Sequence, residues 1–68
     1  MVRFVLSEFE NHWNVSRHDT MVTQVAAGVP TEEEALRIVR PIAESERPSN
    51  IIRIDRFGKS KILFEFTE

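Results

Sequence analysis

The chain has 68 residues, a net charge of −2 and no cysteine. This length predicts one domain, residues 1–68, with a small core. The lack of cysteine excludes disulfides, thiolate metal sites and cysteine nucleophiles. There is no apolar run of 18 residues, and acidic residues stand where a signal peptide would be apolar. We therefore expect a cytoplasmic protein that makes no membrane contact.

The first part of the chain has the period of strands. Residues 2–9 alternate apolar and polar side chains, which predicts a strand with one buried face. Residues 13–17 alternate in the same way after a polar turn, and residues 20–27 are rich in β-formers. Three successive strands are therefore expected before the middle of the chain.

Only residues 31–47 repeat with a helical period. Thr31 is a good N-cap residue, and Glu34 stands three positions later, as in a capping box. Pro41 interrupts the pattern on its solvent side, which predicts a kinked helix or a break into two short helices. The apolar residues fall within an arc of roughly 160°. They are Ala35, Leu36, Ile38, Val39, Ile42 and Ala43.

Residues 48–50 predict a turn after the helix, and two further strands are expected to follow it. Residues 51–57 place Ile52 and Ile54 on one face, and residues 61–66 alternate after a glycine turn. The order βββαββ indicates an α+β fold, with a single antiparallel sheet and one kinked helix packed on one face. The side chains expected to point inward from the last strand are Ile62, Phe64 and Phe66.

Several short motifs resemble small bacterial ββαβ-type domains of unknown function. They are the Trp13-x-Val15 strand, the TEEEA helix start at residues 31–35, and the last hairpin with its turn at Gly58. The chain differs from these domains at Pro41 and in an additional N-terminal strand. The resemblance implies the fold and brings no assigned activity or catalytic residue.

The sequence offers little support for catalysis. Residues 58–60 match the end of a phosphate-binding loop, but Arg53 stands where that motif needs a glycine, and a strand follows instead of a helix. His12 and His18 could meet across the first hairpin beside Asp19, but no third histidine completes a zinc site. We expect a protein that is not an enzyme and has no metal or cofactor.

A basic and aromatic segment near the C-terminus provides one possible binding surface. Arg53, Arg56, Lys59 and Lys61 surround Phe57. Cations that bind phosphate, beside a ring that stacks on bases, are typical of a surface for single-stranded nucleic acid. The same residues also fit a strand edge that charged side chains protect against aggregation.

The sheet provides the other possible surface. Its face away from the helix, or one of its edges, could receive a partner or a second copy. Val5 and Leu63 are candidates for this interface, and so is Trp13 if it is not part of the core. The leading interpretation is a protein-interaction or adaptor module with an unknown protein partner, forming a homodimer through the sheet. Its size is typical of bacterial or phage accessory proteins. A nucleic-acid-binding domain is the alternative.

Overall fold

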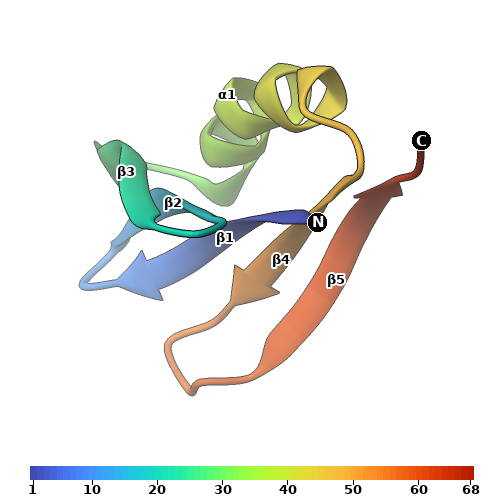
Figure 1. Cartoon of the computed structure of the whole chain (residues 1–68). Coiled ribbons are helices and arrows are strands. Elements are labelled where there is room, and N and C mark those ends of the chain that lie inside the picture. The colour runs from blue at the N-terminus through green and yellow to red at the C-terminus, as the bar shows by residue number, and fades with distance from the viewer.

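The computed structural model describes all 68 residues, which form one five-stranded sheet with a helix lying across one of its faces (Figure 1). The element order βββαββ agrees with the order predicted from the sequence. The elements are β1 (Val2–Phe9), β2 (His12–His18), β3 (Val22–Val29), α1 (Glu32–Ser45), β4 (Ser49–Ile54) and β5 (Ser60–Phe66).

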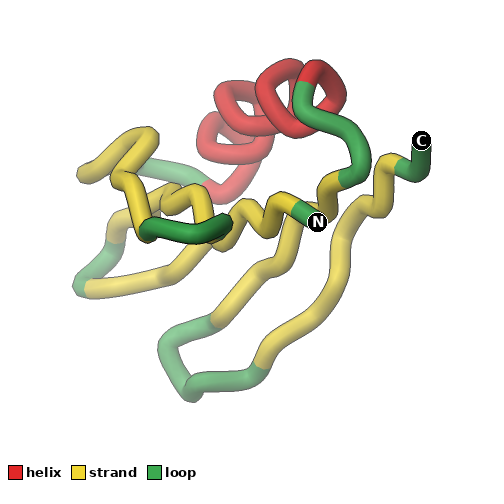
Figure 2. Tube along the Cα trace, viewed as in Figure 1, coloured by secondary structure: helices red, strands yellow, loops and turns green.

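The strand order is β3-β2-β1-β4-β5, with β1 in the centre (Figures 1 and 2). The pair β1–β4 is parallel, and the other three pairs are antiparallel. The prediction of a purely antiparallel sheet was therefore wrong. The helix carries the chain back along the sheet after β3, so β4 begins at the same end as β1. Such a crossover connection is what a parallel pair requires.

The strand boundaries differ most from expectation around β4. Ser49 was expected in a turn, but it begins this strand, is fully buried, and donates a hydrogen bond from Oγ to the carbonyl of Ala43 at the end of α1. This bond joins the start of β4 to the last turn of α1, where the Ala43 carbonyl also accepts the Glu46 amide. β4 ends at Ile54, so Phe57 lies in the following turn.

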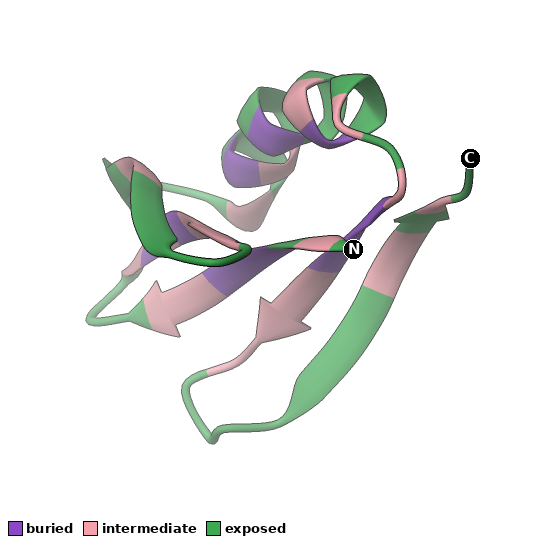
Figure 3. Cartoon of the chain, in the orientation of Figure 1, coloured by how far each residue is buried: buried purple, intermediate pink, exposed green.

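The core lies between α1 and the three central strands β2, β1 and β4 (Figure 3). Strand alternation directs Phe4 and Leu6 of β1 toward the helix. On α1 the fully buried positions are Ala35, Val39 and Ala43, whose small side chains let the helix approach the sheet closely. The nine residues of the core cluster are Phe4, Leu6, Trp13, Val15, Val29, Ala35, Val39, Ala43 and Ile51.

Both ends of α1 are fixed by side chains. The Thr31 hydroxyl accepts a hydrogen bond of 3.1 Å from the Glu34 amide, as the sequence predicted. The helix runs without a break through Pro41, which is exposed. At the other end, Arg17 of β2 donates from Nε and Nη2 to Oε1 of Glu46, over 2.9 and 2.7 Å. The pKa of Arg17 is raised above its ordinary value, and the largest cause is its side-chain hydrogen bonding to Glu46.

A bulge in β5 changes which of its side chains share a face. Phe64 pairs with Ile51 and Ile62 pairs with Ile52, so Leu63 is an extra residue between them. A bulge of this kind shifts the alternation of the strand. Phe64 and Phe66 therefore lie on the helix side, whereas Ile62 lies on the opposite face. The expectation that all three point inward was wrong for Ile62.

Candidate interaction surfaces

The face of the sheet opposite α1 is uncovered, and we call it the open face. Val5 of β1 pairs in register with Ile52 of β4, which in turn pairs with Ile62 of β5. Ile54 lies two residues further along β4, on the same face. Val5 is 8% exposed and Ile62 is 52% exposed. These four side chains form an apolar patch across three adjacent strands.

A polar row crosses the open face next to this patch. His18, Arg3, Asn50 and Glu65 are consecutive partners across β2, β1, β4 and β5. Asn50 is only 7% exposed, and its Oδ1 atom has no hydrogen-bond partner. A buried polar atom without a partner costs about 1–3 kcal/mol. A donor supplied by another molecule would remove this cost.

The three residues predicted for a protein interface do not share one surface. Trp13 is 7% exposed and belongs to the core on the helix side. Leu63 is half-buried at the bulge of β5 and packs against the same core. Val5 alone lies on the open face.

The five residues predicted for nucleic-acid binding are divided between two places. Arg53 lies on the helix side of β4, where its Nε is 3.1 Å from Oε2 of Glu32 and its guanidinium lies 5.4 Å from the centroid of Trp13. Lys61 is its register partner on β5. The guanidinium of Arg53 therefore already contacts Glu32 and the ring of Trp13.

The other three residues lie at the turn between β4 and β5. Phe57 is 77% exposed, and the guanidinium of Arg56 lies 5.3 Å from its ring centroid. Asp55 shapes this turn, because its Oδ1 accepts the amide hydrogens of Phe57 and Lys59 over 2.9 and 3.0 Å. The hydrogen bond from Lys59, followed by that from Phe57, lowers the pKa of Asp55 below its ordinary value.

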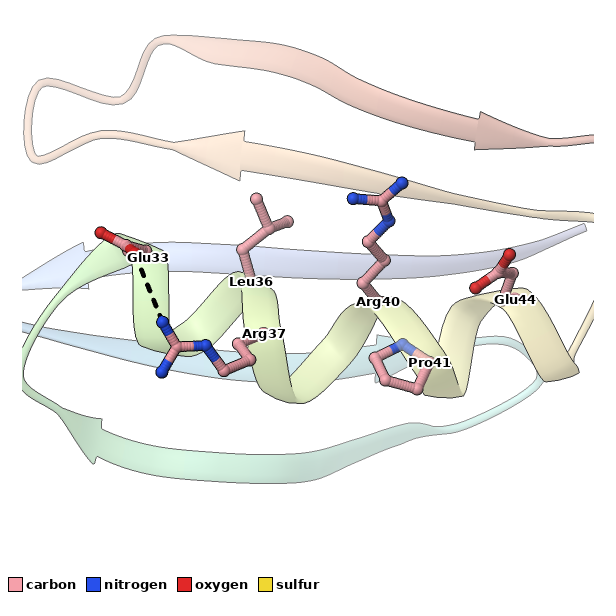
Figure 4. Close-up of a pocket in the computed structure, with 6 residues that line it drawn as sticks. All are labelled: Glu33, Leu36, Arg37, Arg40, Pro41 and Glu44. Atoms are coloured by element: carbon pink, nitrogen blue, oxygen red, sulfur yellow. Dashed lines mark hydrogen bonds and ion pairs between the residues drawn. The ribbon is translucent and has the colours of Figure 1, made fainter.

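A third surface lies beside α1, where the helix leaves most of β5 uncovered (Figure 1). A shallow depression of about 390 Å³ runs along α1 itself, and every residue that lines it belongs to the helix (Figure 4). Leu36 and Arg40 point from α1 toward β4, whereas Arg37 runs along the helix toward Glu33. The six residues that line the depression are Glu33, Leu36, Arg37, Arg40, Pro41 and Glu44.

Two arginines connect this side of α1 to β5. The guanidinium of Arg40 lies 4.7 Å from the ring centroid of Phe64, and that of Arg47 lies 5.4 Å from Phe66. The two rings are 6.2 Å apart and nearly parallel. Sequence reasoning missed this arrangement, because nothing in the chain indicates which strand the two arginines approach. We call the surface formed by Arg40, Arg47, Phe64 and Phe66 the α1–β5 groove.

The geometry provides no metal-binding cluster. His12 and His18 stand at opposite ends of β2, so the first hairpin does not bring them together. No group of three or more potential ligands could hold a metal ion. The single helix is not long and apolar enough to cross a membrane.

Comparisons with family models, with curated proteins and with solved structures found no match to this chain. The three surfaces described above are therefore the features of the molecule that indicate a function.

Proposed function

We propose that the protein is a non-enzymatic protein-interaction module that forms a homodimer through the open face of its sheet. The observation that carries this proposal is the uncovered apolar patch of Val5, Ile52, Ile54 and Ile62, which lies beside the unpartnered Oδ1 of Asn50. Two such faces packed together would bury both patches in one interface.

A second copy fits the open face because the polar row is complementary to itself. A two-fold axis along the strands, between β1 and β4, brings β1 opposite β4 of the other copy and β2 opposite its β5, and leaves β3 outside the interface. Arg3 then faces Asn50 of the partner subunit, and His18 faces the partner's Glu65. The guanidinium of Arg3 would then donate a hydrogen bond to Oδ1 of the partner's Asn50, an atom that accepts no hydrogen bond within one copy. The same axis places Val5 opposite the partner's Ile52.

The size of the face indicates the strength of the dimer. Five strands spaced about 4.8 Å apart, each about 20 Å long, present about 500 Å² per copy. This is at the small end of specific interfaces, where complexes are weak or transient. We therefore expect a dissociation constant on the order of micromolar.

Sedimentation equilibrium over a range of protein concentrations tests the dimer. We expect the wild-type chain to shift from monomer to dimer, and Ile62→Glu to remain monomeric because it places a charge in the apolar patch. Ile38→Glu is the matched control, since Ile38 is 42% exposed on α1, away from the open face. A wild-type monomer at several hundred micromolar, or an equal effect of both variants, would refute the proposed interface.

The alternative function, binding of single-stranded nucleic acid, is favoured by one observation. Phe57 exposes 77% of its surface at the end of a hairpin, with Arg56 stacked on its ring and Lys59 beside it. A base could stack on this ring while the cations contact phosphates. Asp55 in the turn and Glu8, which accepts a hydrogen bond from the Arg56 amide, oppose this by placing negative charge nearby.

Fluorescence anisotropy of a labelled thymidine oligonucleotide tests this alternative. Binding should weaken steeply as salt increases, and Phe57→Ala and Arg56→Glu should each reduce it. Lys61→Glu is a useful comparison, because Lys61 lies beside Arg53 on the helix side and not at the turn. Binding that does not depend on salt would exclude this mode.

A further inference from the structure

β5 ends the sheet with a free backbone edge. It pairs only with β4, so the N–H and C=O groups on its other side have no strand partner. On the helix side, Phe64 and Phe66 are half-buried and carry Arg40 and Arg47 over their rings. Such an edge is a template for an additional strand.

We propose that the edge of β5, together with the α1–β5 groove, binds an extended acidic segment of a partner protein as a sixth strand. Alternate side chains of that segment would enter the groove, because successive residues of a strand point to opposite faces. Apolar side chains would pack against Phe64 and Phe66, and acidic side chains would pair with Arg40. The proposal extends the interaction function proposed above but does not require the dimer.

The two edges of the sheet differ in their readiness to accept a strand. β3 pairs with β2 through two register shifts, and it contains Gly28 with a φ of +65°. Bulges of this kind twist an edge and protect it against further pairing. β5 has one register shift and contains four large apolar residues within its seven. β5 is therefore the edge better suited to a partner.

The charge of the groove selects an acidic partner. Nη2 of Arg37 is 3.3 Å from Oε1 of Glu33, so the charge of Arg37 is already paired within α1. Arg47 makes a loose contact with Glu44, at 3.9 Å. Arg40 has no carboxylate within ion-pair distance and points toward the groove (Figure 4). A carboxylate from the added strand would supply the counterion that Arg40 lacks.

A peptide fits these features better than a nucleic acid. Guanidinium groups already lie over the rings of Phe64 and Phe66, so a base could stack there only by displacing them. The free strand edge offers backbone hydrogen bonds, which a peptide strand satisfies and a sugar–phosphate backbone does not.

The test uses two fluorescein-labelled peptides of seven residues, the length of β5, one alternating glutamate with valine and one alternating lysine with valine. We expect the full chain to bind the glutamate peptide and not the lysine peptide, with slower amide hydrogen exchange along β5. Arg40→Glu should weaken binding of the glutamate peptide about tenfold, because attraction becomes repulsion. Arg37→Glu is the matched control and should change binding less than twofold.

Three results would overturn the inference. Equal binding of the two peptides would remove the role of charge. Binding that leaves hydrogen exchange in β5 unchanged, or that responds equally to Arg37→Glu and Arg40→Glu, would place the site elsewhere. Tighter binding of a thymidine oligonucleotide, abolished by Arg40→Glu, would make the groove a nucleic-acid site. Arg40→Gln, which removes the charge without reversing it, should give an intermediate affinity. None of these results depends on the oligomeric state that sedimentation measures.

Discussion

Ile51→Ala should strongly destabilise the fold, whereas Ile52→Ala should not. The two isoleucines are neighbours on β4 but point to opposite faces of the sheet. Ile51 is fully buried beneath α1, and Ile52 is half-buried on the open face. Chemically identical substitutions at adjacent positions therefore measure which face of the strand the helix covers.

The expected size follows from burial. Truncating a fully buried isoleucine to alanine costs about 2–5 kcal/mol, through lost transfer free energy and the cavity that remains. A domain of 68 residues has a total stability of about 3–10 kcal/mol. Ile51→Ala should thus remove about 3–4 kcal/mol, a large part of the total. Ile52→Ala should cost about 1 kcal/mol, since its side chain already contacts water.

Urea denaturation followed by circular dichroism measures both changes. The midpoint should fall for Ile51→Ala with an unchanged slope, because the same surface is exposed on unfolding. Ile51→Val is informative if the alanine variant does not fold, and it should cost about 0.5–1.5 kcal/mol. Repeating both measurements at several protein concentrations identifies any contribution of the proposed dimer to the cost at Ile52, because only that contribution depends on concentration. Equal losses at the two positions, or a larger loss at Ile52, would contradict the packing of α1 on this face.

Substitutions at three other positions test local features. Gly58→Ala should destabilise the last hairpin by about 1 kcal/mol because Gly58 has a φ of +81°, and Gly58→Asn should cost less; urea denaturation measures both. Thr31→Ala should cost about 1 kcal/mol in the same assay, through loss of the N-cap. The folded-state pKa of Asp55 is lowered, so its stabilising contribution is present above its unfolded pKa and is lost as pH falls through the folded value. Asp55→Asn should therefore flatten the acid limb of a stability–pH curve.

The sequence predicted the elements well but not their pairing. Alternation in residues 2–9 identified the buried face of β1, because Phe4 and Leu6 are large and their neighbours include Arg3 and Ser7. The parallel pairing of β1 with β4 had no such signal. Alternation specifies which face of a strand is buried and says nothing about its neighbour.

Register within β5 was unpredictable for a different reason. Ile62, Leu63 and Phe64 are three consecutive apolar residues, so either phase of alternation places large side chains inward. The bulge at Leu63 resolves this by changing the phase in the middle of the strand. Ser49 was misassigned to a turn because the carbonyl that its hydroxyl binds belongs to a residue six positions earlier, at the end of a helix.

The candidate surfaces were only partly predictable. Arg53 was counted among the free cations because its partner Glu32 lies 21 residues away, at the start of α1. Trp13 was left open between core and interface, and its burial on the helix side now places it in the core. The α1–β5 groove was not anticipated, since it depends on how far the helix extends across the sheet. Exposed side chains can be identified from a sequence, but their ion pairs depend on tertiary structure.

The two proposed surfaces are compatible within one assembly. The dimer would use the face opposite α1, while the added strand would use the backbone edge and the helix side of β5. A dimer would then present two α1–β5 grooves, so a partner with two acidic segments could occupy both and gain an effective concentration on the order of millimolar for the second. Arg3→Glu should leave the affinity for a single segment unchanged and remove this gain, because Arg3 is exposed on β1, away from β5, and faces the partner's Asn50 in the proposed dimer. Self-association would in this way determine which partners the module retains.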